Sequence, residues 1–118
     1  MKLLEKLKKR VTDVKEMTGV SMRRDPKVIE VMAEDRSWAM RSEAARSVYA
    51  PEKVLEKLSH DENIKVRYFV AANESTPFPV LKRMKQEGGR IAKIVISNPT
   101  YQKKAKQSKE KNKAKKKA

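Results

Sequence analysis

The sequence contains no cysteine, one histidine, three glycines and no long apolar run among its 118 residues. The absence of cysteine excludes disulfide bonds, thiolate metal sites and cysteine nucleophiles. His60 alone does not make a zinc site of the histidine-rich kind. No apolar stretch reaches the roughly 20 residues that a membrane span requires, and the N-terminus, charged from Lys2, lacks the continuous apolar stretch of a secretory signal. We therefore expect no metal, no cofactor and a cytoplasmic location.

Residues that carry catalysis or base stacking are also scarce. Glu43 is a lone carboxylate in a segment of small residues, without a nucleophile or second carboxylate at a suitable spacing. We therefore expect no enzyme site and no small-molecule substrate. Trp38, Tyr49 and Phe78 are expected to pack between helices rather than to form a ligand cage. Since Tyr68 and Phe69 fall within an expected helix, a base-stacking platform is disfavoured.

Positive charge is what the chain has in excess. Its 30 lysines and arginines against 15 aspartates and glutamates give a net charge of +15. By segment the charge is +5 over 1–24, −2 over 25–61, +4 over 62–101 and +8 over 102–118. Such asymmetry is typical of proteins that bind an acidic partner, although a lysine-rich end can also serve solubility alone.

One motif recurs along the chain at intervals of 25 to 26 residues. At an interval of 26 the matched positions are Asp35 and Asp61, Arg41 and Arg67, Ala45 and Ala71, Pro51 and Pro77, and Val54-Leu55 and Val80-Leu81. At an interval of 25, the segment 66–73 aligns with 91–98. Apolar residues spaced by three and four within each copy predict a pair of short helices. Copies that stack on one another predict an all-α helical repeat.

Helix boundaries follow from prolines, glycines and small polar residues. Asp25-Pro26, Pro51 and Pro77 are predicted to open the first helix of each pair. The remaining boundary predictions are Ser37 and Asp61 as caps of helices over 38–47 and 62–73, a break at Gly88-Gly89, and an end of the last helix at Pro99.

The two ends of the chain differ from the repeats. Residues 1–24 predict a basic amphipathic helix that either caps the first repeat or lies on a membrane surface. Its apolar face is Leu3, Leu4, Leu7, Val11, Val14 and Met17. Residues 102–118 carry no large apolar side chain and are predicted to be a disordered lysine-rich tail, continuing only briefly as helix from Thr100.

The repeat at 25–101 resembles the variant leucine-rich repeat and, more broadly, the HEAT-like helical repeats. The matching pattern runs through Asp61, Val66-Arg67, Val70-Ala71-Ala72-Asn73, Pro77 and Val80-Leu81. This resemblance implies a short right-handed helical-repeat solenoid with an N-terminal capping helix. Some members of the variant leucine-rich family hold an iron–sulfur cluster on cysteines, which the present composition excludes. Other HEAT-like proteins bind DNA or excise bases, and this shorter chain lacks a matching carboxylate-and-aromatic pocket.

Three groups of basic residues are candidates for contact with a polyanion. Arg41, Arg67 and Lys93 either form a ladder that tracks phosphates or pair with Asp35 and Asp61 within the fold. A basic patch surrounds the glycine pair and consists of Lys82, Arg83, Lys85, Arg90 and Lys93. The tail lysines are Lys103, Lys104, Lys106, Lys109, Lys111, Lys113, Lys115, Lys116 and Lys117.

The functional hypothesis is a non-enzymatic binding module that associates with nucleic acid, DNA or RNA, through the basic patch and the tail. The alternative is a protein–protein interaction adaptor that uses the concave repeat surface, with the tail docking an acidic protein surface. Association with a membrane surface is disfavoured.

Overall fold

The structure, a computed structural model, describes residues 24–117, and side chains as far as residue 109. The capping helix expected at 1–24 lies outside the described residues, apart from Arg24. Between 24 and 117 the chain is all-helical, with seven helices and no strand. The helices are α3 (Pro26–Met32), α4 (Trp38–Arg46), α5 (Glu52–Leu58), α6 (Ile64–Ala72), α7 (Phe78–Lys85), α8 (Gly89–Ser97) and α9 (Pro99–Lys117). None of them has both the length and the hydropathy to cross a membrane.

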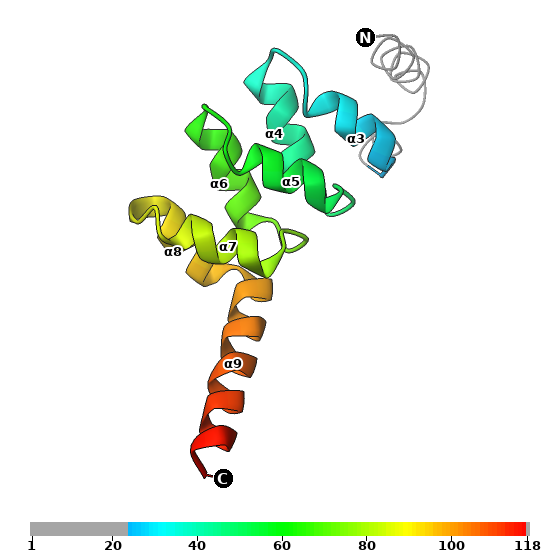
Figure 1. Ribbon diagram of the computed structural model, residues 1–118. Helices are drawn as coiled ribbons and strands as arrows, with labels where there is room; N and C mark the ends of the chain where they lie inside the picture. The colour runs from blue at the N-terminus through cyan, green and yellow to red at the C-terminus, as the bar shows by residue number, and fades with distance from the viewer. Residues whose placement is uncertain (1–23, 118) are drawn as a thin grey trace.

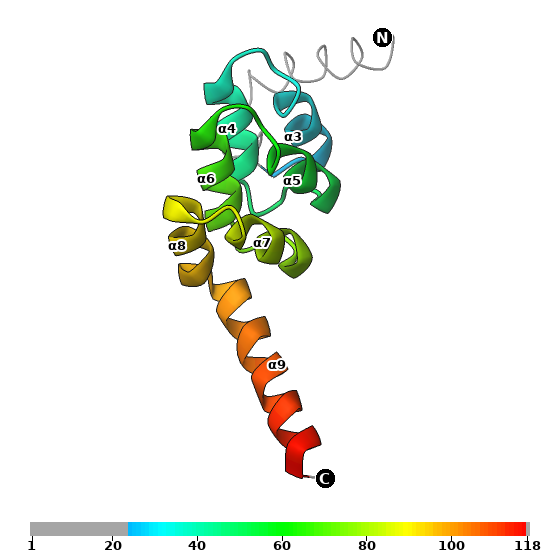
Figure 2. The same ribbon diagram turned by 60° about the vertical axis from the view of Figure 1, so that its left-hand side comes forward.

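The helices α3 to α8 form two layers that run along the molecule (Figures 1 and 2). The first layer contains α3, α5 and α7, and the second layer contains α4, α6 and α8. Within the second layer, α4 packs against α6 and α6 packs against α8. The molecule is elongated, about 58 Å long and 26 Å across. Consecutive helices therefore alternate between layers, so residues 25 to 26 positions apart become neighbours in one layer.

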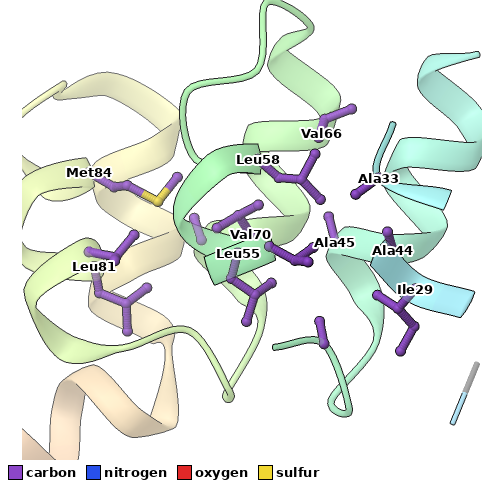
Figure 3. Packing of buried hydrophobic residues seen from close by; sticks show 14 of the residues in the cluster. Ile29, Ala33, Ala44, Ala45, Leu55, Leu58, Val66, Val70, Leu81 and Met84 are labelled. Carbon is purple, nitrogen blue, oxygen red and sulfur yellow. The ribbon is translucent and has the colours of Figure 1, made fainter. Parts of the chain in front are cut away.

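The core lies between the two layers. First-layer helices supply large side chains at three- and four-residue spacing, such as Leu55 and Leu58, while the second layer supplies the smaller Ala44, Ala45 and Val70. Figure 3 shows these five side chains together between the layers. Small residues on one side allow close helix approach, and each buried leucine stabilises the fold by about 1.5–3 kcal/mol.

The predicted helix starts are confirmed at the prolines and corrected at one cap. The Asp25 carboxylate accepts a hydrogen bond from the Lys27 N–H at 2.9 Å, with Pro26 following it, and Pro51 and Pro77 occupy the N-cap positions of α5 and α7. Asp61 does not cap α6. That role belongs to Asn63, whose Oδ1 accepts from the Lys65 N–H at 2.8 Å.

Two more boundaries depend on backbone geometry. Gly88 and Gly89 have φ values of 75° and 59°, a left-handed conformation that glycine adopts without strain, so the predicted break is confirmed. The predicted end of the last repeat helix before Pro99 is confirmed, but Pro99 also opens a further helix. α8 ends at Ser97 with Asn98 as its C-cap, and Pro99 is the first residue of α9, where a missing backbone N–H costs nothing.

Buried asparagines close the ends of the second-layer helices. The Asn73 amide donates to the backbone oxygens of Ala45 and Ser47, at 2.8 and 2.7 Å, and its Oδ1 accepts from the Ser75 N–H. Asn98 repeats the arrangement one pair later, donating to the oxygens of Ala71 and Asn73. Carbonyls at a helix C-terminus lack partners within the helix. These two amides therefore join each helix pair to the preceding pair.

The segment 102–118 differs from the disordered tail that its composition predicts. Helix α9 continues to Lys117, and Figure 1 shows it projecting from the two layers. Its start is held by Tyr101, whose ring centroid lies 5.5 Å from that of Phe78 in α7. Disorder was predicted because the segment lacks large apolar residues. Lysine, alanine and glutamine nevertheless have high helix propensity, and a helix satisfies its own backbone hydrogen bonds.

Candidate nucleic-acid interface

Acidic and basic side chains separate along the length of the molecule. Residues 24–62 contain nine carboxylates and seven cations, whereas 63–109 contain two carboxylates and eleven cations. The first group belongs to α3, α4 and α5, and the second to α6 through α9, which reach the opposite end (Figure 1). Since α9 packs against both α7 and α8, its lysines continue from their basic side chains. One end of the molecule is therefore strongly positive.

Ion pairs engage both lysines of α5 and the arginine of α7. Lys53 of α5 pairs with Glu30 of α3 at 2.8 Å, and Lys57 pairs with Glu34. Arg83, a member of the predicted basic patch, donates to the Ser59 hydroxyl at 2.6 Å and also contacts the His60 ring. Its guanidinium lies 3.6 Å from the Glu56 carboxylate. The structure thus gives Arg83 a packing role.

The other four residues of the patch have no carboxylate partner among the described side chains. These are Lys82 and Lys85 of α7 and Arg90 and Lys93 of α8. All four are exposed. On α9, Lys103, Lys104, Lys106 and Lys109 are likewise exposed and without an ion pair in this part of the chain. The lysines beyond residue 109 belong to the same helix by sequence.

The ladder of Arg41, Arg67 and Lys93 is not formed. α4, α6 and α8 each have nine residues and end before Ser47, Asn73 and Asn98. In this register Arg41 matches Arg67, but the next equivalent residue is Ala92 rather than Lys93. Alignment at an interval of 26 misplaces α8 by one residue, because α7 is one residue longer than α5 while the connection after it is two residues shorter.

Arg41 is held within the fold. Its Nε donates to Asp61 at 2.8 Å and its Nη2 to the same carboxylate at 3.2 Å, while Nη1 donates to the backbone oxygens of Asp35 and Arg36. Arg67 donates to the Asp61 backbone oxygen at 2.5 Å and lies 3.8 Å from Glu87. Both arginines therefore brace the turns between helices, as the structural alternative for this group predicts.

The Arg41–Asp61 pair predicts how stability depends on pH. Burial raises the pKa of Asp61, but hydrogen bonds from Arg41 and from the Asn63 N–H outweigh it, so the pKa lies below its ordinary value of 3.8. A lowered pKa stabilises the fold above pH 3.8, and this contribution is lost as the pH falls through the folded-state value. Below pH 3.8 the unfolding free energy of the native chain should fall more steeply than that of Asp61→Asn, by at most about 1.4 kcal/mol per pH unit. Urea unfolding at pH 2 to 5 tests this, and equal slopes would show that the pair does not govern acid stability.

A second group of side chains lies along the helices of the second layer, where Tyr68, Phe69 and Ile94 are half-buried and pack against the core. Positions two, five, six and nine of each nine-residue helix share one face by helical spacing. In α6 these positions hold Lys65, Tyr68 and Phe69, and in α8 they hold Arg90, Lys93 and Ile94. Trp38, at the first position of α4, and Arg46, at its ninth, join them. These eight residues are called the second-layer face below.

Three cation–π contacts cross this face. The Lys65 Nζ lies 5.0 Å from the centre of the Trp38 ring, the Arg46 guanidinium lies 5.3 Å from that of Phe69, and the Arg90 guanidinium lies 5.8 Å from that of Tyr68. Each contact joins two neighbouring helices. The small number of aromatic residues, and the position of Tyr68 and Phe69 within a helix, disfavoured an aromatic platform. Aligning the second helices from their C-caps places Lys65 and Arg90 at one position, and this signal was missed.

Comparison with protein-family models, with curated proteins and with solved structures finds no match. Among the described side chains, no group of three or more histidine, aspartate and glutamate residues is arranged to hold a metal ion.

Proposed function

We propose that this chain is a non-enzymatic nucleic-acid-binding protein built as a short right-handed solenoid of HEAT-like or variant leucine-rich repeats. The repeat reading is supported by helix pairs that alternate between two layers at a spacing of 25 to 26 residues. It is further supported by the equivalent bridges of Asn73 and Asn98.

The observation that carries the binding function is the accumulation of cations without ion-pair partners at one end. Lys82, Lys85, Arg90 and Lys93 belong to α7 and α8, the two helices that pack against α9, and the sequence of α9 contains nine lysines. Like charges held together are stable only when counterions or a polyanion neutralise them. Release of counterions condensed on a phosphate backbone would then drive binding.

The length of α9 suits a regular polyanion. Nineteen residues at 1.5 Å each span about 28 Å. Over that distance a nucleic-acid duplex presents on the order of 16 phosphates. An acidic protein surface seldom offers so dense a line of charge, which favours nucleic acid over an acidic protein as the partner.

One observation favours the alternative of a protein-interaction adaptor. Val48 and Tyr49, in the connection between α4 and α5, are 48% and 51% exposed. Apolar contact at this connection would depend weakly on salt and would survive the loss of α9. The two functions are therefore separated by the salt dependence of binding.

Charge reversal at α8 tests the proposed function. Arg90→Glu with Lys93→Glu removes two contacts, so the slope of log affinity against log salt should decrease by about two. Affinity at about 100 mM salt should fall on the order of 10-fold or more. Fluorescence anisotropy with a labelled 20-nucleotide strand measures both quantities.

The matched control is Lys27→Glu with Arg36→Glu, which makes the same change in net charge on exposed residues of the acidic end. This control should bind within about threefold of the native chain if contact is local to the basic end. If the two double variants weaken binding equally, the effect comes from the net charge of the chain and not from contacts at the basic end. Absence of binding at 100 mM salt would contradict the proposed function.

A further inference from the structure

The second-layer face combines exposed aromatic surface with exposed cations. Trp38 is 42% exposed, although it is the largest apolar side chain in the protein. Ile64 holds the equivalent first position of α6 and is 47% exposed. Lys65, Arg90 and Lys93 are also exposed, while Tyr68 and Phe69 are half-buried. Rings and charges therefore alternate along a surface that crosses three helices.

The geometry points to a binding surface for the bases of single-stranded nucleic acid, with Trp38, Tyr68 and Phe69 as stacking groups. This inference rests on the proposed function and adds to it the strand class and the residues that meet the bases. Each ring lies 5.0 to 5.8 Å from a cation on the neighbouring helix. A base that stacks on a ring would thus place its phosphate near that cation.

Magnitudes favour a base over the cation as the partner of each ring. A cation–π contact at an exposed site contributes about 0.5–1 kcal/mol. A base stacked on an aromatic side chain contributes about 1–3 kcal/mol. A displaced lysine or arginine still gains a phosphate contact. Exchange of the intramolecular contact for the base is therefore favourable.

A shallow depression of about 300 Å³ lies between α6 and α8 on the same side. Ala72 and Ile94 give it an apolar floor, and Lys93 stands at its edge, with Ser97, Asn98 and Pro99 completing the lining. An apolar recess beside a lysine fits a planar ring attached to a phosphate. The depression adjoins α9, so a strand held by its lysines can continue onto the second-layer face.

Duplex nucleic acid suits the aromatic rings of the second-layer face less well than a single strand does. Its bases are stacked within the helix and do not present their faces to a protein side chain. Only the phosphates of a duplex would reach Lys65, Arg90 and Lys93. Single strands therefore gain stacking in addition to charge neutralisation, and we expect the chain to prefer them.

Trp38 gives a direct readout because it is the only tryptophan. The full chain is titrated with a 12-nucleotide oligouridylate and with a 12-base-pair duplex, and the anisotropy of a label on the nucleic acid measures binding separately. Stacking should quench Trp38 emission with the single strand and leave it unchanged with the duplex. Trp38→Leu should weaken single-strand binding on the order of 10-fold, because one stacked base is lost, without changing duplex binding.

Tyr49→Leu is the matched control. It removes an aromatic ring of similar exposure that lies outside the second-layer face, and it should leave both affinities unchanged. If oligouridylate binds with unchanged Trp38 emission and Trp38→Leu binds as the native chain does, the rings only pack against cations. The inference then fails while the proposed function stands. If neither nucleic acid binds, the proposed function itself fails.

Discussion

Asn73→Ala is expected to lower the free energy of unfolding by about 3 kcal/mol. The substitution leaves the backbone oxygens of Ala45 and Ser47 and the N–H of Ser75 without their partner. Each unsatisfied buried group costs about 1–3 kcal/mol, and the cost is smaller where a water molecule can replace the lost partner. Asn73 is only 5% exposed, so little water reaches these groups. Urea unfolding followed by circular dichroism measures the change.

Asn63→Ala is the matched control, because it deletes the same amide from a partly exposed cap that accepts one hydrogen bond. Loss of a cap of this kind costs about 1 kcal/mol. Asn73→Ser is a second comparison, since Ser47 occupies the equivalent position and accepts from the Tyr49 N–H. Serine should retain the acceptor but lose the two donated bonds. If Asn73→Ala costs no more than Asn63→Ala, the bridge is not what joins the helix pairs.

Replacing the nine lysines of 103–117 with glutamine is expected to lower the affinity for nucleic acid on the order of 100-fold at about 150 mM salt. Each lysine–phosphate contact contributes about 0.7 to 0.9 to the slope of log affinity against log salt, so the slope should decrease by several units. Glutamine has a helix propensity close to that of lysine, which separates the loss of charge from a loss of helix. Anisotropy titrations over a range of salt concentrations measure both effects.

A chain ending at Tyr101 is the companion variant. It retains the contact of Tyr101 with Phe78 and the Lys85 ammonium over the Tyr101 ring. Its unfolding free energy should therefore stay close to that of the full chain, while its affinity should fall as in the glutamine variant. Unchanged affinity in both variants would remove α9 from the binding surface and favour the protein-interaction alternative.

Features that repeat locally were accessible from the sequence. Pro51 and Pro77 predicted helix starts because proline fixes the first helical dihedral angle and needs no donor. Leu55 and Leu81 belong to the apolar spacing that predicted helices, and both are buried. The glycine pair at 88–89 predicted a break that the positive φ values confirm.

Features that depend on register between helices were not accessible. Asp61 and Asn63 are both good caps, and only the observed helix start shows that Asn63 caps α6 while Asp61 binds Arg41. Nor does composition show that a lysine-rich segment without apolar residues is helical, because propensity and lack of burial point in opposite directions there.

The division of charge gives the two ends of the molecule different roles. Glu30 of α3 and Glu34, just after α3, are bound to Lys53 and Lys57 of α5 and hold these two helices together. Along α7, α8 and α9 there are few carboxylates, whereas lysines and arginines remain frequent. Ion pairs between helices thus stabilise the repeats at one end of the molecule. At the other end most of the basic side chains that the structure describes have no ion-pair partners.

The most direct test of binding at the basic end is a proton–nitrogen correlation spectrum of the full chain, titrated with a single-stranded oligonucleotide. Amide shifts should gather in α6, α7, α8 and α9 and at the start of α4, and those of α3 and α5 should remain unchanged. Shifts confined to α3, α5 or the connection at Val48 and Tyr49, or none at a saturating concentration, would contradict binding at the basic end.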